Sequence, residues 1–228
     1  MDKWLFVSLI KLFYISIFKR NMNRSFKQNL TCPDNSERCY FIKPFEIISS
    51  YNSFINTWDI VNKAYKKTSN VSDAKLMQAL SESSVFGFIS YSNWISKKAF
   101  IKANTINPVL KYHNVINGNG SNSVSRYLYK LIPLFSDISC KFNSKQSEVF
   151  FIESSPEKDN EFKKYFIDLF EKKAGDISSL AFFKAIYRKS KFRFIFIIDH
   201  KDNTKPFIKN NSGDFRIYSS FFKTVKNY

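Results

Sequence analysis

Cysteine, histidine and glycine are all scarce in this sequence. It has three cysteines, two histidines and five glycines in 228 residues. Three cysteines make no disulfide framework in a chain of this length, and neither histidine lies at zinc-finger spacing from Cys32 and Cys39. These two cysteines could still pair with each other or share a metal. The simpler expectation is free thiols in a reducing compartment, with no metal site and no cofactor.

Recognisable catalytic motifs are missing as well. The few glycines form no Gly-rich phosphate loop, and the sequence has neither an HExxH zinc motif nor a nucleophile elbow. Asp199, His200 and Asp202 resemble fragments of a metal-dependent nuclease site, but a solvated loop after a strand accounts for them more simply. We therefore predict no catalytic residues and a protein that is not an enzyme. A nucleic-acid enzyme using Asp199 and Asp202 is kept as an alternative.

No apolar run is long enough to cross a bilayer. The longest, residues 4–18, falls short of the roughly 20 apolar residues that a spanning helix needs, and it contains Lys11. No small-residue cleavage site follows it, so we expect no secretory signal. Three interpretations stay open for this segment: a helix docked on a neighbouring protein, a helix on a membrane surface, and a part of the fold.

Acidic residues are scarce, and the resulting positive charge lies toward the two ends of the chain. Asp and Glu number 19 against 36 Lys and Arg, a net charge of +17. Residues 1–45 carry +5 (eight basic, three acidic) and residues 184–228 carry +8 (eleven and three), while the longer middle carries only +4. Basic extensions around a nearly neutral core are typical of proteins that bind a polyanion, because each Lys or Arg placed on a phosphate releases counterions.

Apolar and aromatic residues are plentiful enough to build a folded core, at 44% and 18% of the chain. Their spacing and the flanking turn residues predict helices and strands along the chain. The predicted helices cover 52–66, 72–84 and 155–175. The predicted strands cover 86–91, 97–103, 106–112, 124–132, 136–142, 148–152, 180–183 and 192–198.

The middle of the chain resembles the eighth small-subunit ribosomal protein, in its bacterial-type form. Similar segments follow one another in the same order: residues 71–80 leading into 87–90, then 108–112, 130–140, 151–155 and 173–183. The resemblance implies an α+β fold of two small α/β subdomains with mixed or antiparallel sheets. On this basis we expect an N-terminal extension at 1–45, subdomains at 46–112 and 113–183, and a basic aromatic C-terminal extension at 184–228.

The resemblance also implies binding to small-subunit rRNA. Residues matching the family's RNA-contacting loop, together with nearby lysines, would bind sugar and phosphate groups, and basic residues beside aromatic rings in the C-terminal extension would add phosphate and base contacts. The predicted RNA-binding residues are Ser154, Ser155, Lys158, Lys63, Lys66, Lys67, Lys75, Arg188, Lys189, Lys191 and Arg193.

The sequence therefore predicts a structural constituent of an organellar small ribosomal subunit. Its partners would be small-subunit rRNA and neighbouring ribosomal proteins, its location the mitochondrial matrix, and membrane contact is not expected. The alternative is an accessory subunit of an organellar membrane complex, anchored by residues 4–18.

Overall fold

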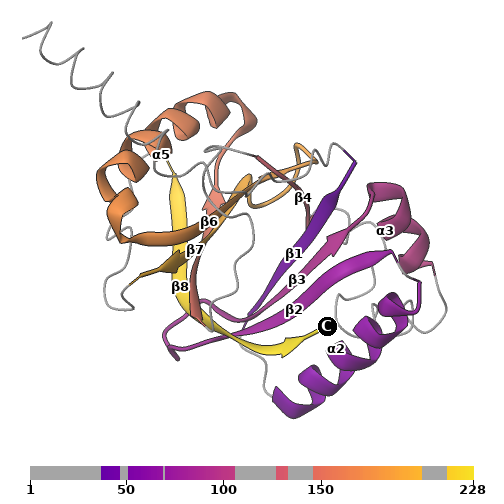
Figure 1. Cartoon of the computed structure of the whole chain (residues 1–228). Coiled ribbons are helices and arrows are strands. Elements are labelled where there is room, and N and C mark those ends of the chain that lie inside the picture. Colours follow the sequence, from indigo (N-terminus) through magenta and orange to yellow (C-terminus); the bar gives the residue numbers. More distant parts are fainter. Residues whose placement is uncertain (1–36, 47–50, 69, 106–126, 133–145, 202–214) are drawn as a thin grey trace, which may run out of the picture.

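The strands of this chain close into one antiparallel barrel (Figure 1). The computed structural model describes residues 37–46, 51–68, 70–105, 127–132, 146–201 and 215–228. Around the barrel the strands follow the order β1-β3-β2-β8-β5-β7-β6-β4. They are β1 (Cys39–Glu46), β2 (Val71–Ala79), β3 (Phe86–Trp94), β4 (Leu128–Leu131), β5 (Gln146–Glu153), β6 (Ile177–Ala185), β7 (Phe194–His200) and β8 (Arg216–Asn227).

The barrel consists of two halves with the same strand order. In the first half, β4, β1, β3 and β2 lie side by side, so that the fourth, first, third and second strands of that half are neighbours. In the second half, β8, β5, β7 and β6 repeat this order. Each half therefore has the strand order of a ferredoxin-like sheet. The pairs β2–β8 and β4–β6 join the two halves and close the barrel.

Helices cover the outside of each half (Figure 1). The first half carries α2 (Tyr51–Lys66) and α3 (Lys97–Asn104), and the second carries α5 (Asp159–Lys173). The short 3-10 turns η2 (Pro156–Lys158) and η3 (Ala174–Asp176) flank α5. Helix α2 presents Phe54, Trp58 and Val61 to the sheet at helical spacing. None of the helices among the described residues has the length and apolar character needed to cross a membrane.

The barrel interior is filled with apolar and aromatic side chains. One cluster takes inward-facing residues from strands of both halves, including Ile42, Ile89, Val149 and Ile197, and all four are completely buried. The layers between the barrel and its helices form separate apolar clusters. Strands buried on both faces need no alternation of apolar and polar residues, which is why their sequence pattern is weak.

The predicted fold of two small α/β subdomains with basic extensions is wrong. The residues assigned to two subdomains and a C-terminal extension belong to a single closed sheet, in which β8 pairs with both β2 and β5. The segment at 192–198 forms most of β7, between β5 and β6. The expected boundary at 183/184 falls within β6. The N-terminal extension, including residues 4–18, lies outside the described residues.

Individual elements were predicted with mixed success. The structure confirms the helix at 52–66 and most of the helix at 155–175, as well as strands at 86–91, 148–152, 180–183 and 192–198. The helix predicted at 72–84 is wrong, because these residues form β2 and the turn after it. The strand predicted at 97–103 is also wrong, because α3 begins there after Ser96, whose hydroxyl caps the Ala99 amide. The predictions at 106–112 and 136–142 lie outside the described residues.

Candidate functional site

The two halves of the barrel differ in the layer between the sheet and its first helix. In the second half this layer is a stack of phenylalanine rings. Phe166 lies 3.7 Å from Phe196, Phe196 lies 4.4 Å from Phe182, and Phe162 lies 4.8 Å from Phe194, measured between ring centroids. All of these rings are buried. This stack gives the second half a structural core and leaves the layer under α5 filled.

The corresponding layer of the first half contains polar groups. On β1 the outward face reads Phe41, Lys43 and Phe45, whereas the same face of β5 carries Glu148, Phe150 and Ile152. On β3, serines occupy two outward positions, Ser90 and Ser92, where β7 has phenylalanine and isoleucine. Burying a polar side chain in an apolar layer has a desolvation cost, which burying a phenylalanine does not have. In the second half the buried polar group on this face is paired, since Glu148 lies 2.8 Å from His200, whereas Lys43 forms no ion pair with a described carboxylate. Lys43 is therefore the candidate for a function.

Lys43 is the most unusual of these residues. The residue is only 8% exposed. Its ammonium group lies 4.7 Å from the ring centroid of Phe45 and 5.3 Å from that of Tyr127. No carboxylate among the described residues forms an ion pair with it. Burial lowers the pKa of Lys43 from 10.5 to about 8. About a tenth of the molecules therefore carry the neutral amine at pH 7, against roughly one in three thousand for an ordinary lysine.

Two serine hydroxyls stand beside Lys43 on the next strand. Ser90 is the direct partner of Lys43 in the β1–β3 register, and Ser92 is the partner of Phe41. The indole N–H of Trp58 donates to the Ser90 hydroxyl over 2.8 Å, and that of Trp94 donates to Ser92 over 2.9 Å. Both hydroxyls therefore accept a hydrogen bond, and neither donates one to another described residue. Each keeps a proton that it can donate to a ligand oxygen.

Removing the indole donor tests how Ser90 is held. We expect Trp58→Phe to lower the free energy of unfolding by about 1–2 kcal/mol, because the buried hydroxyl loses its donor while the ring volume is largely kept. Urea unfolding of Trp58→Phe, Ser90→Ala and the double variant measures the coupling between the two residues. In a variant that already lacks one of the two groups, replacing the other should lower the free energy of unfolding only a little. Strictly additive losses would show that the bond contributes nothing.

A hollow opens on the same side of the first half, at the start of α2. Its volume is about 390 Å³, within the range of small-molecule pockets. It is lined by Tyr51 of α2, by Lys223 of β8 and by β2 and the turn that follows it. A series of ring contacts leads from the hollow to Lys43. The Tyr51 ring lies 5.1 Å from Phe88, and Phe88 lies 4.9 Å from Phe54, measured between centroids. Phe54 lies 4.8 Å from Phe45, the ring beneath the Lys43 ammonium. The hollow and Lys43 thus lie at two ends of one aromatic cluster.

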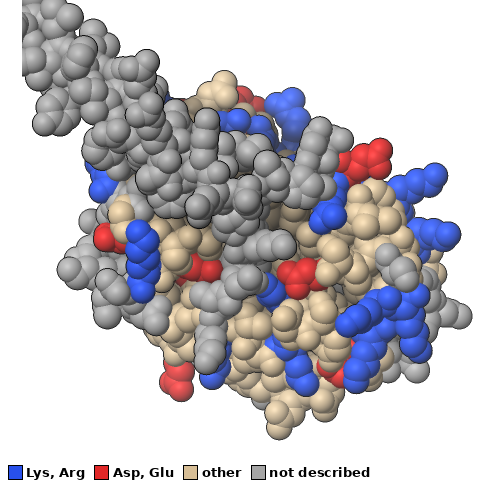
Figure 2. Space-filling model, in the orientation of Figure 1, with Lys and Arg blue, Asp and Glu red and all other residues tan. Residues whose placement is uncertain are grey.

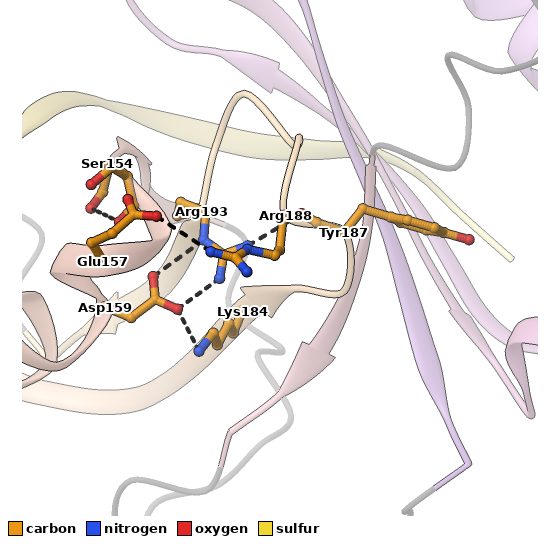
Figure 3. A network of polar contacts seen from close by, with 8 residues as sticks. Ser154, Glu157, Asp159, Lys184, Tyr187, Arg188 and Arg193 are labelled. Carbon is orange, nitrogen blue, oxygen red and sulfur yellow. Dashed lines mark hydrogen bonds and ion pairs between the residues drawn. The ribbon is translucent and has the colours of Figure 1, made fainter.

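A second polar network lies at the start of α5, on the other half of the barrel (Figure 3). Asp159 accepts hydrogen bonds from the Arg193 guanidinium at 3.2 and 2.7 Å, and the Lys184 ammonium lies 2.6 Å from the same carboxylate. Arg193 also donates to the Tyr187 carbonyl. The Arg193 side chain is only 5% exposed. This network ties α5 to β6 and β7, so we interpret it as structural.

The residues predicted to bind RNA lie in several places. Arg193 is inside the Asp159 network, and Lys75 is a buried residue of β2 paired with Asp73 at 3.6 Å. The surface residues of the β6–β7 turn are partly neutralised: Arg188 lies 3.3 Å from Glu157, and Lys191 lies 3.4 Å from Glu153. Three others stand around η2: Ser154, Ser155 and Lys158. Lys63, Lys66 and Lys67 are exposed at the end of α2, where Lys63 lies 2.7 Å from Asp59, and Lys189 is exposed in the β6–β7 turn. RNA contact by these surface residues stays a prediction.

The alternative nuclease residues do not converge. Asp199 accepts hydrogen bonds from the hydroxyls of Ser147 and Ser179, at 2.6 and 2.8 Å. His200 lies on the opposite face of β7, 2.8 Å from the Glu148 carboxylate. Asp202 is outside the described residues. No group of three potential metal ligands occurs within the described segments, and Cys39, the one cysteine they include, is a buried free thiol.

Comparisons with known proteins point to the barrel fold. No protein-family model matches the sequence, and no curated protein matches it. Among solved structures, an anthrone oxidase-like protein matches with a TM-score of 0.54 and 8% identity, over 87% of this chain and 95% of that chain. Provisionally named monooxygenases from Fusobacterium nucleatum and Lactobacillus acidophilus match at TM-scores of 0.49 and 0.47, with 12% and 9% identity, over 84% of this chain and 94% and 98% of theirs.

These findings correct the function predicted from the sequence. The fold is shared with a protein named for oxidase chemistry, and it differs from the two-subdomain architecture on which the ribosomal prediction rested. The predictions of a structural rRNA-binding constituent and of its membrane-complex alternative are therefore wrong, as is the prediction that the chain is not an enzyme. Mitochondrial location and the partners named with it are not tested by the fold. Lys43, which the sequence reasoning missed, carried a readable signal: a lysine between two phenylalanines on the same face of an apolar strand.

Proposed function

We propose that this chain is an enzyme that acts on a small, planar, largely apolar molecule with an acidic hydrogen whose removal leaves negative charge on an oxygen, such as a phenol or an aromatic ketone. The observation that carries the proposal is Lys43, a buried amine with a lowered pKa among aromatic rings. Desolvated lysines of this kind serve as general bases. The name of the anthrone oxidase-like protein of the same fold supports this class of substrate.

The first-half residues divide the chemistry among them. The neutral amine of Lys43 takes a proton from the substrate and becomes an ammonium ion. That ion then stabilises the negative oxygen of the resulting phenolate or enolate, which it faces in an apolar layer where charges interact strongly. The Ser90 hydroxyl donates a further hydrogen bond to the oxygen. The rings between Lys43 and the hollow, Phe45 and Phe54 among them, pack on one another, so they must separate for a planar substrate to reach the amine from the hollow at the start of α2.

Proton abstraction can be measured without following any later step. Anthrone carries acidic hydrogens on the ring carbon opposite its ketone, and removing one of them places negative charge on the ketone oxygen. Proton exchange at that carbon in heavy water, followed by proton NMR, therefore reports the base directly. We expect the full chain to accelerate the exchange, with a rate that rises with pH and levels off above about 8, as the neutral amine becomes the main form.

Lys43→Arg is the matched variant for this measurement. Arginine keeps the positive charge and much of the bulk but cannot lose its proton, so binding of the anion should survive while exchange falls to the uncatalysed rate. A wild-type protein that gives no acceleration over buffer, or a Lys43→Arg variant that keeps the wild-type rate and pH profile, would show that Lys43 is not a base.

A further inference from the structure

Charge is distributed unequally over the helices of the two halves. Helices α2 and α3 contain five lysines and one acidic residue, Asp59. In contrast, α5 contains four acidic and four basic residues. Lys67, directly after α2, adds another positive charge. Figure 2 shows Lys and Arg side chains gathered over α2 and α3, seen in the orientation of Figure 1. The outer surface of the first half is therefore strongly cationic, and that of α5 is not.

The same surface exposes large apolar side chains. Ile60 of α2 is 42% exposed and Ile101 of α3 is 48% exposed. Ile60 and Lys63 are three residues apart on α2, so they share one face, and Lys67 follows directly after the helix. On α3, Lys98 shares a face with Ile101 and Lys102, three and four residues further on. Every large apolar residue that stands exposed in the described segments lies between residues 51 and 101. Each helix thus exposes one isoleucine with lysines beside it.

The two helices form one continuous surface because they are bonded to each other. The Tyr65 hydroxyl near the end of α2 donates to the Asn104 side chain at the end of α3, over 2.8 Å. The Ile95 amide, just before α3, donates to the Asn70 carbonyl, just after α2. We call the exposed residues of this region the α2–α3 surface: Ile60, Lys63, Lys67, Lys98, Ile101 and Lys102.

We propose that the α2–α3 surface binds an anionic lipid membrane. Lysines beside exposed isoleucines match such a surface, because the ammonium groups face lipid phosphates and carboxylates while the apolar side chains enter the headgroup region. A purely electrostatic partner such as a nucleic acid would leave Ile60 and Ile101 in water. The proposal is independent of the chemistry at Lys43. It places the hollow at the start of α2 on the half of the molecule that meets the lipid.

Vesicle co-sedimentation of the full chain tests the proposal. We expect binding to phosphatidylcholine vesicles that contain phosphatidylserine, no binding to phosphatidylcholine alone, and weaker binding as salt is added. Neutralising Lys67, Lys98 and Lys102 together to Gln should weaken binding roughly 100-fold, at roughly fivefold for each lysine near an anionic surface. Ile101→Ser should weaken it at least about fivefold, because apolar area that enters the lipid is lost.

The matched control neutralises three exposed lysines elsewhere on the barrel, Lys164, Lys172 and Lys189, and should change vesicle binding less than about twofold. Circular dichroism checks that each variant is folded. The proposal is overturned if the control loses as much binding as the test variant, or if Ile101→Ser binds like the wild type. It is also overturned if the wild type binds heparin or RNA but not the anionic vesicles.

Discussion

Replacing Lys43 by methionine should abolish activity and stabilise the protein at the same time. Methionine has a similar length and no charge, so it fills the space between Phe45 and Tyr127 without the cost of a buried ammonium group. We expect anthrone proton exchange to fall by about 10²- to 10⁴-fold, the usual contribution of a general base. We also expect the free energy of unfolding at pH 7 to rise by about 1–2 kcal/mol.

The gain in stability should depend on pH in a defined direction. Burial lowers the pKa of Lys43 in the folded protein to about 8, against 10.5 for an exposed lysine. The charged lysine therefore destabilises the fold fully below pH 8, where both folded and unfolded chains hold the proton, and progressively less as the pH rises toward 10.5. The advantage of Lys43→Met should shrink over that range, as measured by urea unfolding at several pH values. A methionine variant that is less stable than the wild type at pH 7 would contradict this account.

Lys130→Met is a suitable control for this experiment. Lys130 lies on β4 of the same half and is exposed, so the same change there removes a charge without relieving burial. We expect neither higher stability nor a lower exchange rate from it. If both variants gained stability to a similar extent, the cause would be the reduction of the net charge, which is high in this protein, and not the environment of Lys43.

Removing Asp159 should have the largest effect on folding. Asp159→Ala leaves the Arg193 guanidinium, 5% exposed, without its carboxylate partner, and breaking a buried ion pair in this way costs about 3–5 kcal/mol. Burial alone raises the pKa of Asp159, but hydrogen bonds from Arg193 and Lys184 outweigh it and hold that pKa below its ordinary value. The contribution of Asp159 should therefore be present at neutral pH and disappear as the pH falls through its folded-state pKa.

The neighbouring pair Glu157 and Arg188 provides the control. Both side chains are exposed, at 70% and 78%, although they lie 3.3 Å apart in the same region (Figure 3). Glu157→Ala should leave the urea midpoint unchanged, because solvent screens an exposed pair. Equal losses from Glu157→Ala and Asp159→Ala would mean that burial does not decide the strength of these contacts, which would contradict our description of the network as structural.

How much of this molecule the sequence could reveal depends on how many faces of each element are buried. Helix α2 was predictable because its apolar residues recur on one face only. Strand β2 was mistaken for a helix because Leu76 packs under α2 while Met77 faces the barrel interior, so consecutive residues are both buried. Helix α3 was mistaken for a strand because eight residues are too few to show the helical repeat of apolar side chains clearly. Ser96, just before the helix, was a usable sign of an N-cap.

The barrel itself could not be predicted from local patterns. Its closure depends on the pairs β2–β8 and β4–β6, which join segments far apart in the chain. The duplication was hidden because equivalent positions have diverged, with Ser90 and Ser92 in one half corresponding to phenylalanine and isoleucine in the other. The concentration of basic residues toward the chain ends was real, but β7 and β8 use that C-terminal segment to complete the sheet.

The central claim is that Lys43 is held in an apolar layer where its amine can lose a proton near neutral pH. The most direct measurement is an NMR titration of the protein labelled with carbon-13 at the lysine ε position, with Lys43→Met used to assign the signal. We predict one lysine that titrates at about 8, with its signal absent from the variant. If the signal lost in the variant titrates near 10.5, the ordinary value for a lysine, burial does not lower the pKa of Lys43 and the proposed chemistry is wrong.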